Sequence, residues 1–281
     1  MTIHSTPVDY PPASVLSRPP GPMLAQLDSR LPRGERWAYE PKLDGFRGQL
    51  WRRGNAPPQL LSRNGRDLAP WFPELISAAE ALPLSTLLDG EIIIADESGL
   101  ADFGALQRRL TLARKFIAGA VSERPAILLV FDLLELAGEE FGWQALIERR
   151  RALERLLDGM HPCLQLVAHT KDIDVAQGWL AVPGLEGVVA KRLDRPYVPG
   201  RARDWIKVKR HRTVECAVVG IAGDLSSPRL VLGLRHADGR LHLLGRLGGV
   251  ICHLERTRRM PLQARQSLFC RYRAQQQGSV L

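Results

Sequence analysis

The sequence has few cysteines and no long apolar run. Its four cysteines, Cys163, Cys216, Cys252 and Cys270, are scattered and form no C-x-x-C pair, so neither a zinc site nor a disulfide framework is expected. No run of about 18 apolar residues is present, so no membrane-spanning helix is predicted. Residues 1–20 contain no apolar stretch typical of a secretory signal. We therefore expect a cytoplasmic protein with reduced thiols and no membrane partner.

Lysine is missing from the last 70 residues, where arginine carries the charge. Residues 212–281 contain eleven arginines and four acids, which gives 11 − 4 = +7 of the net charge of +9. The first 211 residues therefore carry 9 − 7 = +2. A basic module beside a nearly neutral one favours a polyanionic partner. The alternative, a solvated basic face, explains the charge alone equally well.

The 281 residues are 45% hydrophobic and 25% charged, as in ordinary globular proteins. We predict a flexible Pro-rich lead-in over 1–20, a large domain over 21–211 and a small β module over 212–281. The β module shows three short strand patterns, and the chain beyond Cys252 reads as helical or frayed.

The large domain alternates strand and helix patterns. Residues 37–41 and 46–53 read as two strands, and Asp44-Gly45 between them is a strong hairpin signal. Helix patterns cover residues 70–82, 103–116, 139–157 and 172–180, and Asp102 is the expected N-cap of the second. Further strand patterns run over 59–63, 87–94, 126–134, 163–168, 185–191 and 205–209. The fold class predicted is α+β, with mostly antiparallel sheets and flanking helices.

One lysine has an unusual setting in this pattern. Lys42 lies at the turn between the first two strands, with Glu40 and Asp44 on either side and Arg47 five residues on. A protonated lysine is a poor nucleophile, and a reactive one needs surroundings that favour the neutral amine.

Charged residues also interrupt strands elsewhere: Glu91, Glu186, Lys207 and Lys209. A charge inside a strand is costly unless it is paired or ligated. Any one of them is explained as a rim residue of a half-exposed sheet. Because Lys207 and Lys209 are two residues apart, they share one strand face. Together with Lys42 and Arg47, the set indicates a site for a polyphosphate and a divalent cation.

Six segments together form a recognisable order: Glu40–Arg47 (EPKLDGFR), Ser62–Gly65 (SRNG), Asp89–Glu91 (DGE), Val130–Asp132 (VFD), Glu186–Lys191 (EGVVAK) and Trp205–Lys209 (WIKVK). In this order they resemble the nucleotidyltransferase motifs of ATP-dependent DNA ligases and mRNA capping enzymes. Segments 22–25 and 102–110 resemble most the small bacterial ligases associated with end joining. The resemblance spans residues 22–210 and implies a nucleotidyltransferase (ATP-grasp-like adenylation) domain followed by an OB-fold.

The resemblance implies a role for each matching residue. Lys42 would attack the α-phosphate of ATP and form a lysyl-AMP phosphoramidate, releasing pyrophosphate. The other implied ATP contacts are Glu40 and Phe131 at the adenine, Arg47 and Arg63 at ribose and phosphate, Glu91 at the ribose hydroxyl, and Arg201, Lys207 and Lys209 at the phosphates. Arg63 would later hold the 5′-phosphate of the nick. Glu186 and Glu91 would bind Mg2+ (or Mn2+).

The function implied is an ATP-dependent DNA ligase that seals nicks or breaks in duplex DNA, in repair and recombination. AMP passes from Lys42 to a DNA 5′-phosphate, and a 3′-hydroxyl then attacks to close the strand. A monomer associated with the nucleoid is expected, with a Ku-like end-binding protein as a candidate partner.

The C-terminal module departs from the family pattern. An OB-fold is a five-stranded barrel, whereas three strands are predicted here. The family's final motif, an Arg-x-Asp-Lys-like sequence, is missing, and Arg271-Tyr272-Arg273 does not match it. A truncated barrel is therefore predicted. Its absent motif is expected to impair self-adenylation more than the sealing of a nick that already carries AMP. Two alternatives stay open: an RNA ligase or capping-type nucleotidyltransferase, and a non-catalytic DNA-binding remnant.

Overall fold

The structure, a computed structural model, describes residues 16–210, 212–224, 229–235, 240–247 and 269–274. By its internal contacts the chain divides into unit 1, residues 1–210, and unit 2, residues 211–281. Most of the predicted Pro-rich lead-in and of the basic tail beyond Cys252 lies outside the described residues. Among the helices that are described, none is long and apolar enough to cross a membrane.

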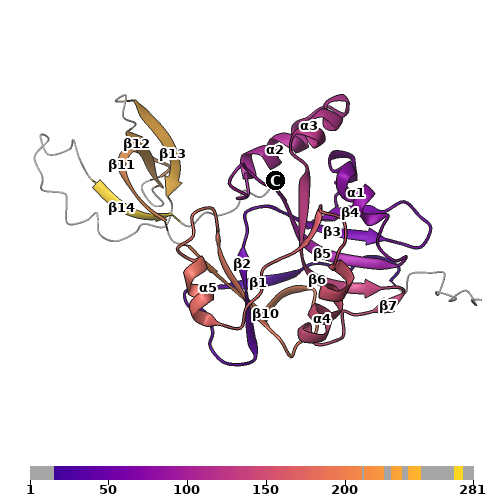
Figure 1. The fold of residues 1–281 in the computed structure, drawn as a ribbon. Helices are drawn as coiled ribbons and strands as arrows, with labels where there is room; N and C mark the ends of the chain where they lie inside the picture. Colours follow the sequence, from indigo (N-terminus) through magenta and orange to yellow (C-terminus); the bar gives the residue numbers. More distant parts are fainter. Residues whose placement is uncertain (1–15, 211, 225–228, 236–239, 248–268, 275–281) are drawn as a thin grey trace, which may run out of the picture. The chain divides into compact units, whose positions relative to one another are not determined.

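Unit 1 contains a six-stranded sheet with the order β4-β3-β5-β6-β7, and β8 pairs with β6 off this path (Figure 1). Its strands are β3 (Phe46–Arg52), β4 (Gln59–Ser62), β5 (Thr86–Ile94), β6 (Ala126–Leu136), β7 (Glu139–Glu140) and β8 (Leu164–Leu166). All neighbours are antiparallel except β6 and β8. The antiparallel sheets predicted from the sequence are therefore present.

Helices cover one face of this sheet. The helical elements of unit 1 are η1 (Ala69–Trp71), α1 (Pro73–Ala79), α2 (Phe103–Thr111), η2 (Arg114–Phe116), α3 (Ile117–Glu123), α4 (Leu146–Leu157) and α5 (Ile173–Trp179). Leu75 of α1, Leu106 of α2 and Leu153 of α4 are buried in one cluster with Leu88 and Ile92 of β5. Because neighbours in a strand point to opposite faces, Asp89 and Glu91 face away from these helices.

A second, four-stranded sheet has the order β1-β10-β9-β2. It consists of β1 (Met23–Asp28), β10 (Gly200–Lys209), β9 (Gly187–Arg192) and β2 (Trp37–Lys42). β1 and β10 are parallel, with an irregularity between Ala25 and Gln26, and the other pairs are antiparallel. On the outer face, Ala176 of α5 packs with Tyr39 and Val188.

An aromatic cluster joins the inner faces of the two sheets. Trp51 and Phe131 come from the six-stranded sheet, Met23 and Trp205 come from the four-stranded sheet, and Tyr197 lies between β9 and β10; all five are buried. The charged residues of the candidate site lie on the same inner faces. Burial of the aromatic cluster holds the two sheets together, and so sets the distance between the charged residues of one sheet and those of the other.

Unit 2 contains one antiparallel sheet with the order β13-β12-β11-β14. Its strands are β11 (Arg212–Ala222), β12 (Arg229–Arg235), β13 (Leu241–Leu247) and β14 (Phe269–Ala274). Cys216, Leu230 and Leu232 form its small buried cluster. The helical or frayed reading of the end of the chain is wrong over 269–274, because these residues pair with β11 along their whole length.

The predicted hairpin around Asp44-Gly45 is also wrong. β2 pairs with β9 in one sheet, and β3 pairs with β4 and β5 in the other. The turn therefore carries the chain from one sheet to the other. A Cβ at Gly45 would overlap the backbone carbonyl oxygen of Ile92, so the glycine is needed for this close approach.

Three predicted helices are shorter than their sequence patterns. Asp102 caps α2 by accepting from the Ala105 N–H, as predicted, but the helix ends at Thr111. Phe72 is non-helical, so residues 70–82 divide before Pro73. Residues 139–140 are β7 rather than helix, because Ala137 and Gly138 both have positive φ and turn the chain back onto β6.

Candidate active site

Lys42 is the last residue of β2, at the edge where the two sheets meet. Alternation along the strand places it on the inner face with Glu40, while Tyr39 faces α5. The Lys42 carbonyl accepts a hydrogen bond from the Glu186 N–H at 2.8 Å. At the next residue, a Cβ on Gly187 would overlap the Val208 carbonyl oxygen. Backbone packing therefore sets Glu186 beside Lys42.

The Glu186 carboxylate is shared by two lysines. Oε2 forms an ion pair with Lys42 Nζ, and Oε1 lies 2.5 Å from Lys209 Nζ. Partial burial raises the pKa of Glu186, but Lys42 and Lys209 outweigh it, so the net pKa is below the ordinary value. The carboxylate is therefore held ionised between the two ammonium groups.

Lys207 adds a third ammonium group to this edge. It projects from β10 on the same face as Lys209. Partial burial lowers the pKa of Lys207, and the charges of Lys42 and Lys209 lower it further. Three lysines around one carboxylate leave a surplus of positive charge, which favours an anionic ligand.

The six-stranded sheet supplies Arg47 and Asp89 opposite these lysines. Arg47 donates from Nε and Nη2 to the two Asp89 oxygens, each at 2.5 Å. The Tyr197 hydroxyl donates to Asp89 at 2.6 Å and accepts from the Met23 N–H at 2.8 Å. Asp89 is fully buried, so the arginine is fixed by a bidentate bond that solvent does not reach.

Glu91 is the second carboxylate at this edge. Burial raises its pKa to about 7, although Lys42 and Arg47 oppose the shift, and Glu186 and Asp89 add to it. The charges of Lys42 and Glu186 therefore both affect the pKa of Glu91, although Glu91 lies on the six-stranded sheet. A cation between the two carboxylates would favour the ionised form of Glu91.

Phe131 lies in the aromatic cluster with cations close to its ring. The Arg47 Cζ is 4.5 Å and the Lys191 Nζ is 4.2 Å from its centroid, and Trp205 meets it edge-on at 5.9 Å. The ring is 9% exposed, so it belongs to the core while keeping one accessible part. Stacking on an adenine stays a prediction.

Glu40 forms a buried ion pair with Lys191, at 2.6 Å. Burial raises the pKa of Glu40 and lowers the pKa of Lys191, while the mutual attraction of the pair opposes both shifts. Sequence reasoning gave Lys191 no role. Strand alternation could have indicated this residue, because it places Val189 and Lys191 together on the inner face of β9. β9 is the neighbour of β2, which carries Glu40.

The two remaining predicted arginines lie less close to Lys42. Arg201 is exposed near the start of β10, and its charge contributes to the lowered pKa of Lys207. Arg63 is exposed in the turn after β4, and within residues 16–210 it forms no ion pair with the lysines or carboxylates of the site. The structure thus brings together all the predicted residues except Arg63, with Arg201 at the margin.

Two carboxylates at this edge meet the needs of a divalent cation. No group of three or more His, Cys, Asp or Glu residues suited to a metal occurs in the described part of the chain. Mg2+ typically binds one or two protein carboxylates, with water and phosphate oxygens completing its shell. Glu186 and Glu91, coupled electrostatically across the two sheets, fit this pattern.

Comparison with known proteins agrees with the motifs. Residues 22–209 match the family model of the ATP dependent DNA ligase domain. DNA ligase C2 of Mycolicibacterium smegmatis is 38% identical over 259 residues, which cover 89% of this chain and 69% of that protein. The multifunctional non-homologous end joining protein LigD of Pseudomonas aeruginosa is 37% identical over 239 residues, which cover 81% of this chain and 27% of that protein.

A solved structure shows the same fold. Mycobacterial DNA ligase D, complexed with ATP and MES, superposes with a TM-score of 0.57 at 29% identity, over 82% of this chain and 72% of that one. The family match covers unit 1 up to the end of β10, and so includes every residue of the candidate site.

Proposed function

This chain belongs to the family of ATP-dependent DNA ligase domains and is an ATP-dependent DNA ligase, and we propose that it works through a lysyl-AMP intermediate on Lys42. The observation that carries the proposal is the lysine-rich edge: Lys42 and Lys209 share the Glu186 carboxylate, and Lys207 lies on the same face. Its substrates are ATP and nicked or broken duplex DNA.

The first step is attack of the Lys42 amine on the α-phosphate of ATP. A nitrogen–phosphorus bond forms while the bond to the bridging oxygen breaks, and pyrophosphate leaves with the electron pair. The Lys42 ammonium, whose ion-pair partner is the Glu186 carboxylate, first loses one proton to solvent to become the neutral amine. The nitrogen loses a second proton to solvent as the phosphoramidate forms. Lys207 and Lys209 supply positive charge beside the phosphates, which stabilises charge that develops during the transfer.

The pocket between the sheets supplies the nucleoside contacts. Phe131 offers part of an aromatic ring to the adenine, and Glu40, held by Lys191, offers a fixed carboxylate. Arg47, oriented by Asp89, reaches the ribose or a phosphate. We assign Arg201 to a phosphate and Arg63 to the 5′-phosphate of the nick.

Glu186 and Glu91 would hold Mg2+ or Mn2+ between the sheets. When bound, the ion supplies Lewis-acid stabilisation of phosphate oxygens. Burial raises the pKa of Glu91 to about 7, and a bound cation would favour its ionised form.

Two further steps follow on DNA. AMP passes from Lys42 to a 5′-phosphate, and the adjacent 3′-hydroxyl then attacks that phosphate and releases AMP. We assign the chain to DNA repair as a monomer at the nucleoid, supported by its similarity to an end-joining protein. A Ku-like protein that binds DNA ends is the partner proposed.

Unit 2 is proposed to be a shortened OB-fold. Its four described strands form an antiparallel sheet, one strand more than the sequence patterns predicted. Its excess of arginine suits contact with DNA phosphates.

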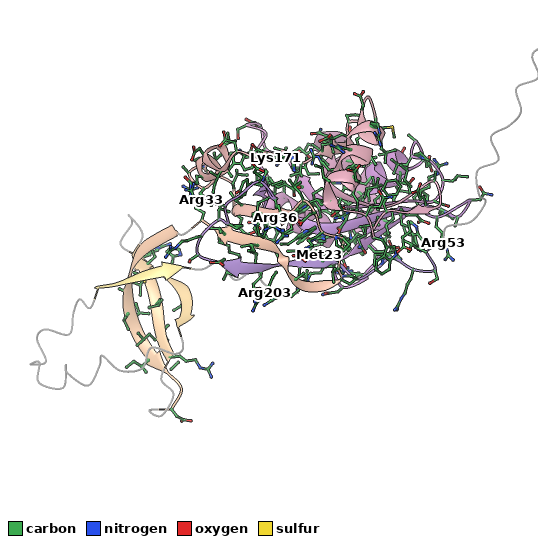
Figure 2. The ribbon with its side chains drawn as sticks, turned by 90° about the horizontal axis from the view of Figure 1, so that it is seen from below. Met23, Arg33, Arg36, Arg53, Lys171 and Arg203 are labelled. Carbon is green, nitrogen blue, oxygen red and sulfur yellow. The ribbon has the colours of Figure 1, made fainter. Side chains whose placement is uncertain are left out.

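The test is incubation with α-labelled ATP and Mg2+, followed by nicked duplex DNA. A labelled protein band and a sealed strand are expected. Lys42→Ala should abolish the label. Lys171→Ala is the matched control: Lys171 is exposed and lines a hollow with Arg33 and Tyr39 on the outer side of the four-stranded sheet, and Figure 2 shows Arg33 and Lys171 at the same end of unit 1.

The outcomes separate the alternatives. A folded protein that gives neither label nor sealed product contradicts the proposal, and salt-sensitive DNA binding alone would identify a non-catalytic remnant. Suppression of the label by GTP would indicate a capping-type enzyme. Faster sealing of an RNA nick than of a DNA nick would indicate an RNA ligase.

A further inference from the structure

Two arginines stack on one tryptophan away from Lys42. The Arg66 Cζ lies 4.8 Å and the Arg114 Cζ lies 4.6 Å from the centroid of the Trp71 ring. Trp71 is the last residue of η1 and packs partly into the core beneath the helices. A guanidinium held against an indole keeps its N–H groups free while losing side-chain freedom before any ligand arrives.

This surface carries more positive charge than its carboxylates balance. Lys115 follows Arg114 in η2, and its Nζ lies 4.9 Å from the ring of Phe116, which is 55% exposed. Within the described part of unit 1, no ion pair neutralises Arg66, Arg114 or Lys115. Asp67 is the one carboxylate next to Arg66 in sequence; it accepts from the Ala69 N–H and forms no ion pair with these cations in the described part of unit 1. Like charges held together without counter-charges favour an anionic partner.

A tight turn connects this surface to β4, which pairs with β3, the strand that carries Arg47. The Arg66 N–H bonds to the Ser62 hydroxyl at 3.0 Å, and the Ser62 N–H bonds to the Arg66 carbonyl at 2.8 Å. Arg63, proposed to hold the 5′-phosphate of the nick, lies in this same turn. Ser62 is paired with Gly48, the residue next to Arg47. Because three residues of extended chain span at most about 11 Å, the Cα atoms of Arg63 and Arg66 lie within that distance of each other.

We propose that Arg66, Arg114 and Lys115, with Trp71 as their support, form a binding surface for the phosphates of duplex DNA beyond the nick; this rests on the proposed function. Duplex DNA presents one charge per about 1.7 Å of its axis, so a strand whose 5′-phosphate lies at Arg63 brings further phosphates past this turn. Stacked arginines suit phosphate because their planar N–H groups bind two oxygens at once.

The experiment measures binding of nicked duplex DNA across a salt series, in parallel with labelling by α-labelled ATP. The double variant Arg66→Ala/Arg114→Ala should weaken DNA binding about 3- to 10-fold, as expected for two exposed charge contacts. The slope of log affinity against log salt should fall by about 2 in magnitude, close to 0.9 for each phosphate contact removed. Labelling of Lys42 should not change.

Arg53→Ala is the matched control. Its Cζ also lies over an indole, 5.1 Å from the Trp51 ring, but it follows β3 at the opposite end of unit 1 from Arg33 and Lys171 (Figure 2). This variant should leave both affinity and salt slope unchanged. Arg66→Lys/Arg114→Lys keeps the charge without the planar stack, and we expect it to restore the slope but only part of the affinity.

Three results would overturn the proposal. They are unchanged DNA affinity and salt slope in the double alanine variant, an equal loss in Arg53→Ala, and a loss confined to duplex RNA. Because binding is measured separately from labelling, a chain that never forms lysyl-AMP would contradict the proposed function and still test this surface.

Discussion

The two faces of the six-stranded sheet use charge in opposite ways. On the helix-covered face, the buried Glu74 carboxylate of α1 is paired with Arg109 of α2 at 2.9 Å and also accepts from the Ala126 N–H. Opposite the inner face, Glu186, which immediately precedes β9 of the four-stranded sheet, is shared between Lys42 and Lys209. The first arrangement pairs one carboxylate with one arginine inside the core, whereas the second keeps surplus cations at an accessible edge.

The comparison shows that burial of charge alone does not identify a functional site. Both arrangements contain carboxylates and cations that are at least partly buried. They differ in stoichiometry, because one carboxylate matched by one arginine needs no ligand, whereas a carboxylate among three lysines does. Substitutions on the two faces should therefore differ in their effect on adenylation.

Removal of a buried carboxylate should destabilise either face, but only one loss should affect adenylation. Asp89→Ala leaves the Arg47 charge without its bidentate partner, and should cost about 3–5 kcal/mol of unfolding free energy. Glu74→Ala is the control on the helical face, with a loss of similar size. Denaturant unfolding measures both. At a temperature where both variants are folded, labelling by ATP should fall for Asp89→Ala only, and an equal effect on labelling would contradict the distinction.

Truncation of an apolar side chain on the helical face should affect stability alone. Leu88 is fully buried beneath the helices and is the strand neighbour of Asp89. Leu88→Ala should cost about 2–5 kcal/mol through lost burial and a cavity. The labelling rate per folded molecule should match the wild type. A large change in the KM for ATP would show that the two faces are coupled.

Stability should depend on pH through Glu91. Burial raises the pKa of this carboxyl from its ordinary 4.5 to about 7, so between these values the folded protein holds a proton that the unfolded chain has released. Stability from this group is therefore present at low pH and lost as the pH rises from about 4.5 to about 7.

Glu91→Gln cannot titrate at this position and isolates the effect. The unfolding free energy of the wild type, relative to this variant, should fall by at most about 3 kcal/mol across the interval. Urea unfolding of both proteins at several pH values, from about 5 to about 7.5, measures this difference in unfolding free energy. A difference that is flat or rises with pH would contradict the raised pKa.

The smallest effect is expected from the hydroxyl that supports Asp89. Tyr197→Phe removes the 2.6 Å hydrogen bond to Asp89 and the 2.8 Å bond from the Met23 N–H. The loss should cost about 1.5–3 kcal/mol, as for a hydrogen bond to a charged group. It should also raise the KM for ATP, because Arg47 loses part of its orientation. Tyr39→Phe is the control: its hydroxyl donates to the Pro32 carbonyl at 2.7 Å, and its ring faces α5. An equal rise in KM for both variants would exclude a positioning role for Tyr197.

Much of the site could be predicted because it depends on local order. Lys207 and Lys209 lie on one face because a strand alternates, and Asp89 and Glu91 leave the helical face for the same reason. Six motifs in sequence order then indicated the family. The α+β class followed from alternating strand and helix patterns, and the structure agrees.

The parts that the sequence missed depend on long-range contacts. Asp44-Gly45 has the local form of a hairpin, but the approach of Gly45 to Ile92 from another strand decides its geometry. The bond between Tyr197 and Asp89 joins residues 108 positions apart, and the pair of Glu40 and Lys191 needs β2 and β9 to be neighbours. No local pattern specifies these partners.

The parallel pairing of β1 with β10 has a consequence for the order of folding. Met23 is paired with Gly200, across 200 − 23 = 177 residues, and contacts of such separation form late because loop closure must come first. The four-stranded sheet therefore cannot be completed until β10 has left the ribosome. Since β10 also carries Lys207 and Lys209, the nascent chain acquires its reactive lysine environment only as its last strand of unit 1 docks.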